Sequence, residues 1–331
     1  MILDGRDPAS VRAAAQALRG GELVGLPTET VYGLGADAVT DTAVAKIFAA
    51  KGRPSDHPLI VHVADASGVD HFAREVPAFA HKLMQVYWPG PLTLILPRRP
   101  EVGAAAAGGQ DSIGLRCPAH PVAHALLLAA REQGVHGVAA PSANQFGRVS
   151  PTTAAHVQGE FGESLLILDG GPCDVGIEST IIDCTRGAPV LLRPGHITRE
   201  QIEASSGQRL RDKDELAAPS PRASGTLEAH YAPKAKLRLM DGKALQTALD
   251  VLGKDFNGAT IAVYARSLLR VPSPKVSYRR MPDDAAATAQ QLFAVLRDFD
   301  AQGVNLIWVE TPPGSSDWEG VRDRLQRAAA S

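Results

Sequence analysis

Residues 24–62 carry the side chains best suited, by type and spacing, to bind a small anion. Lys51 and Arg53 lie where a predicted helix ends in Lys51-Gly-Arg-Pro54, because Gly and Pro both stop a helix. A hydroxyl-rich loop that includes Thr30 precedes this helix, and His62 follows on a predicted strand. Two fixed cations that face hydroxyl groups suit a phosphate or a carboxylate. The spacing alone also fits a solvated helix end with dipole-favoured cations, and His62 also fits a buried core histidine.

Further polar side chains are predicted at strand ends or in loops later in the chain. Ser142 and Asn144 follow one predicted strand, and this pair alone also fits a simple Asx turn. Arg116, Ser150 and Arg193 occupy comparable positions. In α/β domains such positions commonly gather at a ligand site.

Two other motifs do not support the chemistry they suggest, and one common nucleotide-binding motif is absent from the sequence. Gly33-Leu-Gly-Ala-Asp-Ala38 matches a dinucleotide fingerprint, but it neither follows a strand directly nor opens a helix. The sequence contains no phosphate-binding loop of the G-x-x-x-x-G-K-[ST] type. His120 and His124 are four residues apart, yet no adjacent glutamate accompanies them, so a surface pair is favoured over a zinc site and no metal ligand is predicted.

The pattern over residues 1–205 predicts an α/β domain with mixed strands and helices. Asp41 is the expected cap of the helix that ends at Lys51, and Ser150-Pro151 is an expected helix start. Thr198 and Gln201 form a predicted capping box. Residues 27–35 and 101–110 are predicted as loops, the second of them mobile. The predicted helices include 8–19, 77–86 and 121–132, and the predicted strands are 23–26, 59–63, 92–96, 112–116, 137–140, 165–168, 180–183 and 190–193.

Residues 206–233 interrupt this pattern, because they are polar, charge-balanced and contain proline, and they are predicted to be a linker. From residue 234 to 331 strands and helices alternate again, which predicts a smaller Rossmann-like α/β domain. Its predicted strands are 236–240, 259–264, 275–281 and 304–309, and its predicted helices are 243–252, 284–299 and 317–329.

Composition limits the class of protein. The 331 residues suffice for two domains, and 44% apolar with 21% charged residues is ordinary for a globular chain. A net charge of −2 argues against a protein that coats nucleic acid. Three cysteines without a C-x-x-C pair, a polar N-terminus and no long apolar run predict a cytoplasmic protein without a membrane segment.

Taken together, four motifs resemble those of the YrdC-domain family. They are Pro27-Thr-Glu-Thr-Val-Tyr-Gly33, Lys51-Gly-Arg-Pro-Ser-Asp-His-Pro-Leu59, Ala140-Pro-Ser-Ala-Asn144 and Glu178-Ser-Thr180. The end of the linker, Ser224-Gly-Thr-Leu-Glu-Ala-His-Tyr-Ala-Pro233, is similar to the lid of the long, two-domain members, although Ser224 replaces a common proline and Thr226 a common methionine. The resemblance implies a twisted mixed sheet with an open cavity.

The long members are L-threonylcarbamoyladenylate synthases, so the resemblance also implies a reaction. L-threonine, bicarbonate or CO2, and ATP with Mg2+ would give threonylcarbamoyl-AMP and pyrophosphate. A separate transferase complex would then modify tRNA, which this protein would meet only indirectly. Because two anions must meet, catalysis would depend on positioning and charge neutralisation.

The resemblance assigns roles to the matching residues. Lys51 and Arg53 would be catalytic, with Arg53 and Ser55 at the phosphates. The implied threonine site consists of Thr30, His62, Arg116 and Thr180. The implied ATP site adds Ser112, Ser142, Asn144, Ser150 and Arg193, with Tyr231 of the linker closing over the nucleotide.

Two other functions remain alternatives at this point. Some YrdC-like domains bind double-stranded RNA or ribosomes, but the acidic balance of residues 1–205 counts against a generic RNA-binding face. A carbamoyl transferase module of hydrogenase maturation would carry zinc-finger and acylphosphatase segments, and the sequence has neither.

Overall fold

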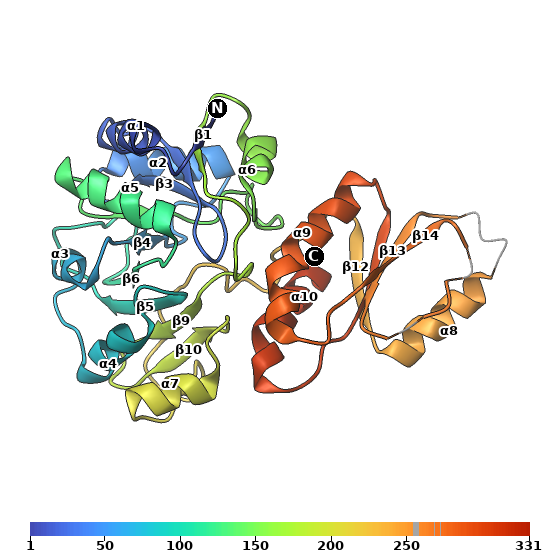
Figure 1. The fold of residues 1–331 in the computed structure, drawn as a ribbon. Helices are drawn as coiled ribbons and strands as arrows, with labels where there is room; N and C mark the ends of the chain where they lie inside the picture. Colours follow the sequence, from blue (N-terminus) through green and yellow to red (C-terminus); the bar gives the residue numbers. More distant parts are fainter. Residues whose placement is uncertain (254–257, 268, 272) are drawn as a thin grey trace. The chain divides into compact units, whose positions relative to one another are not determined.

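The computed structural model describes residues 1–253, 258–267, 269–271 and 273–331 (Figure 1). These residues form two compact units, one of Met1–Phe146 with Ser150–Thr226 and the other of Gly147–Val149 with Leu227–Ser331. The division after Thr226 falls within the segment predicted as a linker. Among the described residues, no helix is both long and apolar enough to cross a membrane.

The first unit is built on an 11-stranded sheet with the order β1-β8-β2-β3-β7-β4-β6-β5-β9-β10-β11. The strands are β1 Ile2–Asp4, β2 Val24–Leu26, β3 Gly33–Asp37, β4 Ile60–His62, β5 Leu92–Pro97, β6 Ser112–Arg116, β7 Val138–Ala139, β8 Leu166–Asp169, β9 Thr180–Asp183, β10 Val190–Arg193 and β11 Arg211–Asp212. The sheet contains both parallel pairs, such as β4 with β6, and antiparallel pairs, such as β5 with β6. The mixed sheet confirms the predicted fold class.

Seven α-helices are described in this unit: α1 Pro8–Arg19, α2 Asp41–Lys51, α3 Val69–Phe72, α4 Ala78–Tyr87, α5 Pro121–Glu132, α6 Ala154–Phe161 and α7 Arg199–Ser206, with a short 3-10 turn at Ala66–Gly68. Helices α1 and α5 lie side by side and bury Leu18 and Leu126 in one apolar cluster with Leu26 of β2. Helix α2 buries Val44 and Ile47 in a second cluster. The buried, apolar faces of these helices hold the sheet in place.

The prediction for residues 33–35 was wrong, because their glycines were taken to indicate a loop. Gly33 and Gly35 were predicted to close a loop, but they belong to a strand paired with β2. A Cβ atom on Gly35 would lie 2.8 Å from both Leu26 Cδ2 and Val138 Cγ1. The strand therefore uses glycine because close packing leaves no room for a side chain.

Two helix starts were also predicted wrongly. Thr40, without a side-chain capping bond, is the N-cap of α2, and Asp41 is the first helical residue. Helix α6 starts at Ala154 with Thr153 as its cap, and the Ser150 hydroxyl donates to Glu178. The capping box of Thr198 and Gln201 on α7 is confirmed.

Residues 101–110, predicted as a mobile loop, form a series of turns packed on the unit. Ala106 and Ala107 are fully buried. The Leu59 amide donates to the Ala106 carbonyl over 2.7 Å. These contacts fix the loop next to the residues that precede β4.

The second unit has a four-stranded parallel sheet with the order β12-β15-β13-β14. Its strands are β12 Lys236–Met240, β13 Ile261–Ala265, β14 Val276–Arg280 and β15 Leu306–Glu310, and its helices are α8 Gly242–Leu252, α9 Ala285–Ala301 and α10 Glu319–Ala329, with a 3-10 turn at Ser316–Trp318. The alternating pattern and the parallel sheet confirm the Rossmann-like prediction.

The packing at Gly35 gives a stability prediction. Gly35→Ala should lower the free energy of unfolding by about 1–3 kcal/mol, because the added methyl group overpacks the site. Gly159→Ala is the matched control: Gly159 is in α6 with no atom within 4 Å of an added Cβ, so it should stabilise by roughly 0.5–1 kcal/mol. Urea unfolding of both variants measures the difference, and an opposite sign at Gly35 would contradict the packing argument.

Candidate active site

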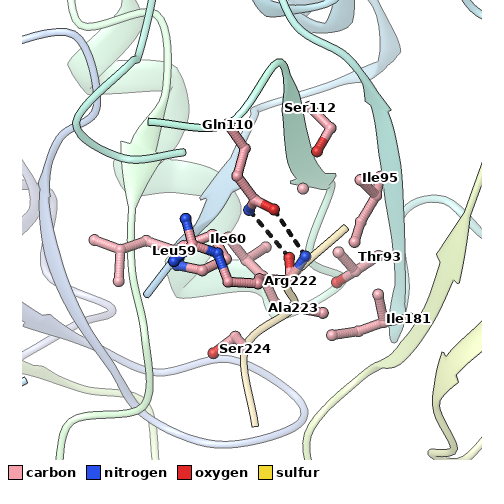
Figure 2. A pocket seen from close by; sticks show the side chains of 12 residues that line it. Leu59, Ile60, Thr93, Ile95, Gln110, Ser112, Ile181, Arg222, Ala223 and Ser224 are labelled. Carbon is pink, nitrogen blue, oxygen red and sulfur yellow. Dashed lines mark hydrogen bonds between the residues drawn. The ribbon is translucent and has the colours of Figure 1, made fainter. Parts of the chain in front are cut away.

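One face of the central strands carries residues from both predicted binding sites. In the parallel pair of β4 and β6, His62 lies opposite Arg116 and Ile60 lies opposite Gly114. Residues two apart on a strand share a face. Ile60, Gly114 and Ser112 line a pocket on this face (Figure 2), so His62 and Arg116 lie on the same face as that pocket. The sheet thus brings predicted threonine and ATP residues together.

Arg116 is the most tightly held of the predicted threonine residues. Its Nη1 donates to Thr30 Oγ1 over 2.8 Å, and its Nη2 donates to Glu29 Oε1 over 2.5 Å. Its Nε donates to the Gly90 carbonyl over 3.2 Å. Arg116 and Glu29 are both buried. The Ala119 amide donates to the second Glu29 oxygen over 3.1 Å, so the guanidinium group is fixed in direction before any ligand arrives.

Glu29 was not among the predicted site residues, although it lies inside the Pro27–Gly33 motif. The signal that could have identified it is a carboxylate within a loop of hydroxyl groups and apolar residues. A carboxylate that becomes buried needs a cation or several hydrogen bonds. Arg116, far along the sequence, supplies the cation here.

His62 lies at this end of the face, and Thr180 is the first residue of β9, one residue before Ile181 of the pocket. Burial, followed by the charge of Arg116, lowers the pKa of His62 to about 3, so the imidazole is neutral near pH 7. The Thr180 amide donates to the Pro91 carbonyl over 3.0 Å, next to the Gly90 carbonyl that holds Arg116. The Thr180 hydroxyl exchanges hydrogen bonds of 3.2 Å with the backbone of Ile197.

Lys51 connects its own motif, residues 51–59, to the motif of residues 140–144 through hydrogen bonds. It ends α2, where Gly52 takes the left-handed conformation with φ of 62°. Its Nζ donates to the carbonyl of Ser142 over 2.6 Å and to the carbonyl of Asn144. Burial, followed by the charge of Arg53, holds the pKa of Lys51 well below its usual value. An anion that approaches Lys51 would favour the charged form of its amino group, because an opposite charge nearby offsets the cost of burial.

Arg53 is buried, and Ser55 is exposed two residues later. Arg53 Nη2 donates to the Pro58 carbonyl over 2.9 Å, and its guanidinium carbon lies 5.7 Å from the centre of the Phe146 ring. The loop between α2 and β4 is therefore folded back on itself around Arg53, which leaves the Ser55 hydroxyl open to a ligand.

Arg193 lies at the end of β10 and is also buried. Its Nε and Nη2 donate to the Ser179 carbonyl over 3.0 and 2.9 Å, and its Nη1 donates to the Ser224 carbonyl over 3.0 Å. Ser179 Oγ lies 2.7 Å from Thr93 Oγ1 of β5. This chain of contacts, which includes the unpredicted Ser179, links Arg193 to the pocket.

The structure places Tyr231 in the second unit. Tyr231 is 1% exposed, and its ring lies 5.5 Å from that of Phe293 and 5.3 Å from the Arg324 guanidinium. It has a positive φ of 61°, which is unusual for a residue other than glycine. Its predicted role as a cover for the nucleotide stays a prediction.

No group of three or more His, Cys, Asp or Glu side chains suited to hold a metal ion is found in the described part of the chain. His120 is the N-cap of α5, where its Nδ1 accepts from the Val122 amide over 3.2 Å.

Family models match nearly all of the chain. A model described as telomere recombination, for the Sua5, YciO and YrdC proteins, matches residues 16–195. A second, described as the C-terminal domain of threonylcarbamoyl-AMP synthase, matches residues 197–330.

Individual relatives agree with the family models. The threonylcarbamoyl-AMP synthase of Bacillus subtilis is 40% identical over 99% of this chain and 94% of its own length. That of Pyrococcus abyssi is 38% identical over 96% of this chain and 94% of its own length. A solved structure of P. abyssi Sua5 complexed with L-threonine superimposes with a TM-score of 0.89 at 36% identity, over 99% of this chain and 97% of that one. The chain therefore belongs to the Sua5/YrdC family of threonylcarbamoyl-AMP synthases.

Proposed function

We propose that this protein makes threonylcarbamoyl-AMP and pyrophosphate from L-threonine, bicarbonate or CO2, and ATP. The observation that carries the proposal is the set of buried cations on and beside one sheet face, at Lys51, Arg53, Arg116 and Arg193. Carbonyl oxygens accept hydrogen bonds from all four. These hydrogen bonds orient the cations, and Arg116 also pairs with Glu29. Four oriented cations on and beside one face suit anionic substrates.

Arg116 is the proposed partner of the threonine carboxylate. Glu29, Thr30 and the Gly90 carbonyl fix its guanidinium group. The hydroxyl group of threonine would be recognised by the polar atoms of Thr30, His62 and Thr180. The neutral imidazole of His62 can accept or donate one hydrogen bond at each nitrogen according to its tautomer.

The chemical step joins two anions. The threonine amine attacks CO2 to form a carbamate and loses a proton, and a carbamate oxygen then attacks the α-phosphorus of ATP as pyrophosphate leaves. Lys51 and Arg53 are the proposed catalytic residues, because they would neutralise the charge that gathers at the carbamate and the phosphates. Ser55, Ser112, Ser142, Asn144, Ser150 and Arg193 are the proposed further ATP contacts.

Mg2+ would enter with ATP and help pyrophosphate to leave. The product, a reactive mixed anhydride, requires a separate transferase to pass its threonylcarbamoyl group to tRNA. We expect these reactions in the cytoplasm, where ATP and tRNA are available. The curated relatives are named as synthases, which supports this function and not the alternative of RNA or ribosome binding.

Removal of either catalytic cation should abolish synthesis. Lys51→Met and Arg53→Ala should each lower threonine-dependent pyrophosphate release by a hundredfold or more, since such contacts are worth on the order of 3 kcal/mol in the transition state. Lys46→Ala is the matched control, because Lys46 lies on the same helix but is 44% exposed and pairs with Glu22. Circular dichroism checks that each variant is folded. Near-normal activity in a folded Lys51 or Arg53 variant would remove that residue from the site.

Substrate choice should distinguish valine from serine. A site that binds the threonine hydroxyl group rejects valine by about 10⁴-fold in kcat/KM, because its own polar groups remain unpaired. Serine lacks only a methyl group and should lose roughly 10- to 200-fold. Pyrophosphate release with each amino acid measures both ratios. If valine and serine react equally well, then Thr30, His62 and Thr180 do not form a polar pocket.

A further inference from the structure

The hydroxyl group of Thr28 lies beside that of Thr30 in the loop between β2 and β3. Thr28 is 2% exposed, and Thr30 is fully buried. Thr28 Oγ1 donates to the Val31 carbonyl over 2.6 Å and lies 2.9 Å from Thr30 Oγ1. A hydroxyl group has one proton, and a carbonyl group can only accept. The Thr28 proton is therefore committed to Val31, so Thr30 must be the donor in the hydrogen bond between the two hydroxyl groups.

Thr30 can consequently act only as an acceptor toward a ligand. Its proton points at Thr28 Oγ1, and Arg116 Nη1 donates to its oxygen over 2.8 Å. The remaining lone pair of Thr30 Oγ1 can be met only by an N–H or O–H group of a ligand. The backbone amides of Thr30 and Val31 each donate to Thr28 Oγ1 over 3.2 Å, and these hydrogen bonds hold Thr28 in this orientation.

Thr180 has the same polarity. Its hydroxyl group donates to the Ile197 carbonyl and accepts from the Ile197 amide, over 3.2 Å each. The Thr180 proton is therefore also committed, and its oxygen can offer a ligand only a lone pair. Two such oxygens do not suit a carboxylate or a phosphate, whose oxygens also accept. They suit the two donor groups of L-threonine, which are its hydroxyl group and its amine.

His62 adds a buried nitrogen that has no hydrogen bond within the protein. His62 is 3% exposed, and its Nδ1 has no hydrogen-bond partner among the described residues. It lies opposite Arg116 in the pairing of β4 with β6, and Arg116 contacts Thr30. An unpaired buried nitrogen is costly. A substrate hydroxyl group that donates to Thr30 keeps lone pairs that can accept from Nδ1 when this nitrogen carries the imidazole proton.

We propose that Thr28 is a specificity-determining positioning residue, which commits the Thr30 proton and thereby makes the site recognise the threonine hydroxyl group as a hydrogen-bond donor. The proposal rests on the proposed function, in which Thr30 is part of the threonine site. Thr28 acts through Thr30. A substituent of the same size that only accepts hydrogen bonds would face a lone pair of Thr30 and would be rejected.

Two competitors of threonine test this polarity in the wild-type full chain. One is the analogue of L-threonine in which fluorine, which cannot donate, replaces the hydroxyl group with the same configuration. The other is valine, in which a methyl group takes that place. Their inhibition constants are measured against formation of threonylcarbamoyl-AMP from labelled threonine. They should agree within about threefold and lie roughly 5- to 150-fold above the threonine KM, because each leaves Thr30 unpaired. A fluorinated analogue that competes about as well as threonine, while valine does not, would overturn the proposal.

Variants of Thr28 test its part in this selectivity. Thr28→Val removes the acceptor of the Thr30 proton, so Thr30 can donate to fluorine, and the preference for the fluorinated analogue over valine should rise about threefold or more. Thr28→Ser keeps the hydroxyl group and should keep the wild-type preference. Thr288→Val is the matched control, because Thr288 is a fully buried residue of the second unit whose hydroxyl group donates to the Pro282 carbonyl over 3.2 Å. Its preference should equal that of the wild type.

Circular dichroism checks that each variant is folded. An unchanged preference in folded Thr28→Val would contradict the role of Thr28. If Thr28→Val does not fold, the wild-type competition and Thr28→Ser still decide, since a serine variant with an altered preference would also contradict it. A wild-type protein that releases no pyrophosphate with threonine and ATP would instead overturn the proposed function, so the two failures are distinguishable.

Discussion

The first unit depends on hydrogen bonds that keep four positively charged side chains oriented away from water. Lys51, Arg53, Arg116 and Arg193 are each at most 8% exposed. A buried charge is tolerated only with hydrogen bonds or an opposite charge. Backbone carbonyls at the ends of strands and in the adjoining loops supply many of these hydrogen bonds. The loops must therefore keep defined conformations, and this requirement explains why so much of the irregular backbone is buried.

Glu29 orients Arg116 with a carboxylate group, in addition to the backbone carbonyl that Arg116 also contacts. Its carboxylate pairs with Arg116 and accepts the Ala119 amide, so the hairpin loop between β2 and β3 is fixed against the end of β6. Truncating one partner of a buried ion pair leaves the other charge uncompensated. The pair thus ties the hydroxyl loop to the central strands and places Thr30 beside the arginine.

Residues 206–226 show that a polar, proline-containing segment can be part of a compact unit. The side chain of Arg186 is largely shielded from solvent and pairs with Asp183. It donates to the carbonyls of Lys213 and Ala218 over 3.1 Å each. Together with the contacts of Arg222 and Arg193, these hydrogen bonds hold the segment along the first unit. Its polar composition reflects side chains and backbone groups that bond to the unit's loops, where a core-forming segment would use apolar residues.

The sequence by itself determined the element types over most of the chain. The spacing of apolar residues and the Gly and Pro residues that end an element are local features. The predicted bounds of α1, α5, β6 and β12 match the structure, since Pro, Gly and alternating apolar residues mark them directly. Motif spacing also predicted the family. Only the tertiary structure decided that Gly33–Asp37 is a strand, that Glu29 pairs with Arg116, and that residues 222–224 line the pocket on the sheet face. Each of these features depends on contacts between residues that are distant in the sequence. A local pattern cannot show which of the buried groups will come into contact.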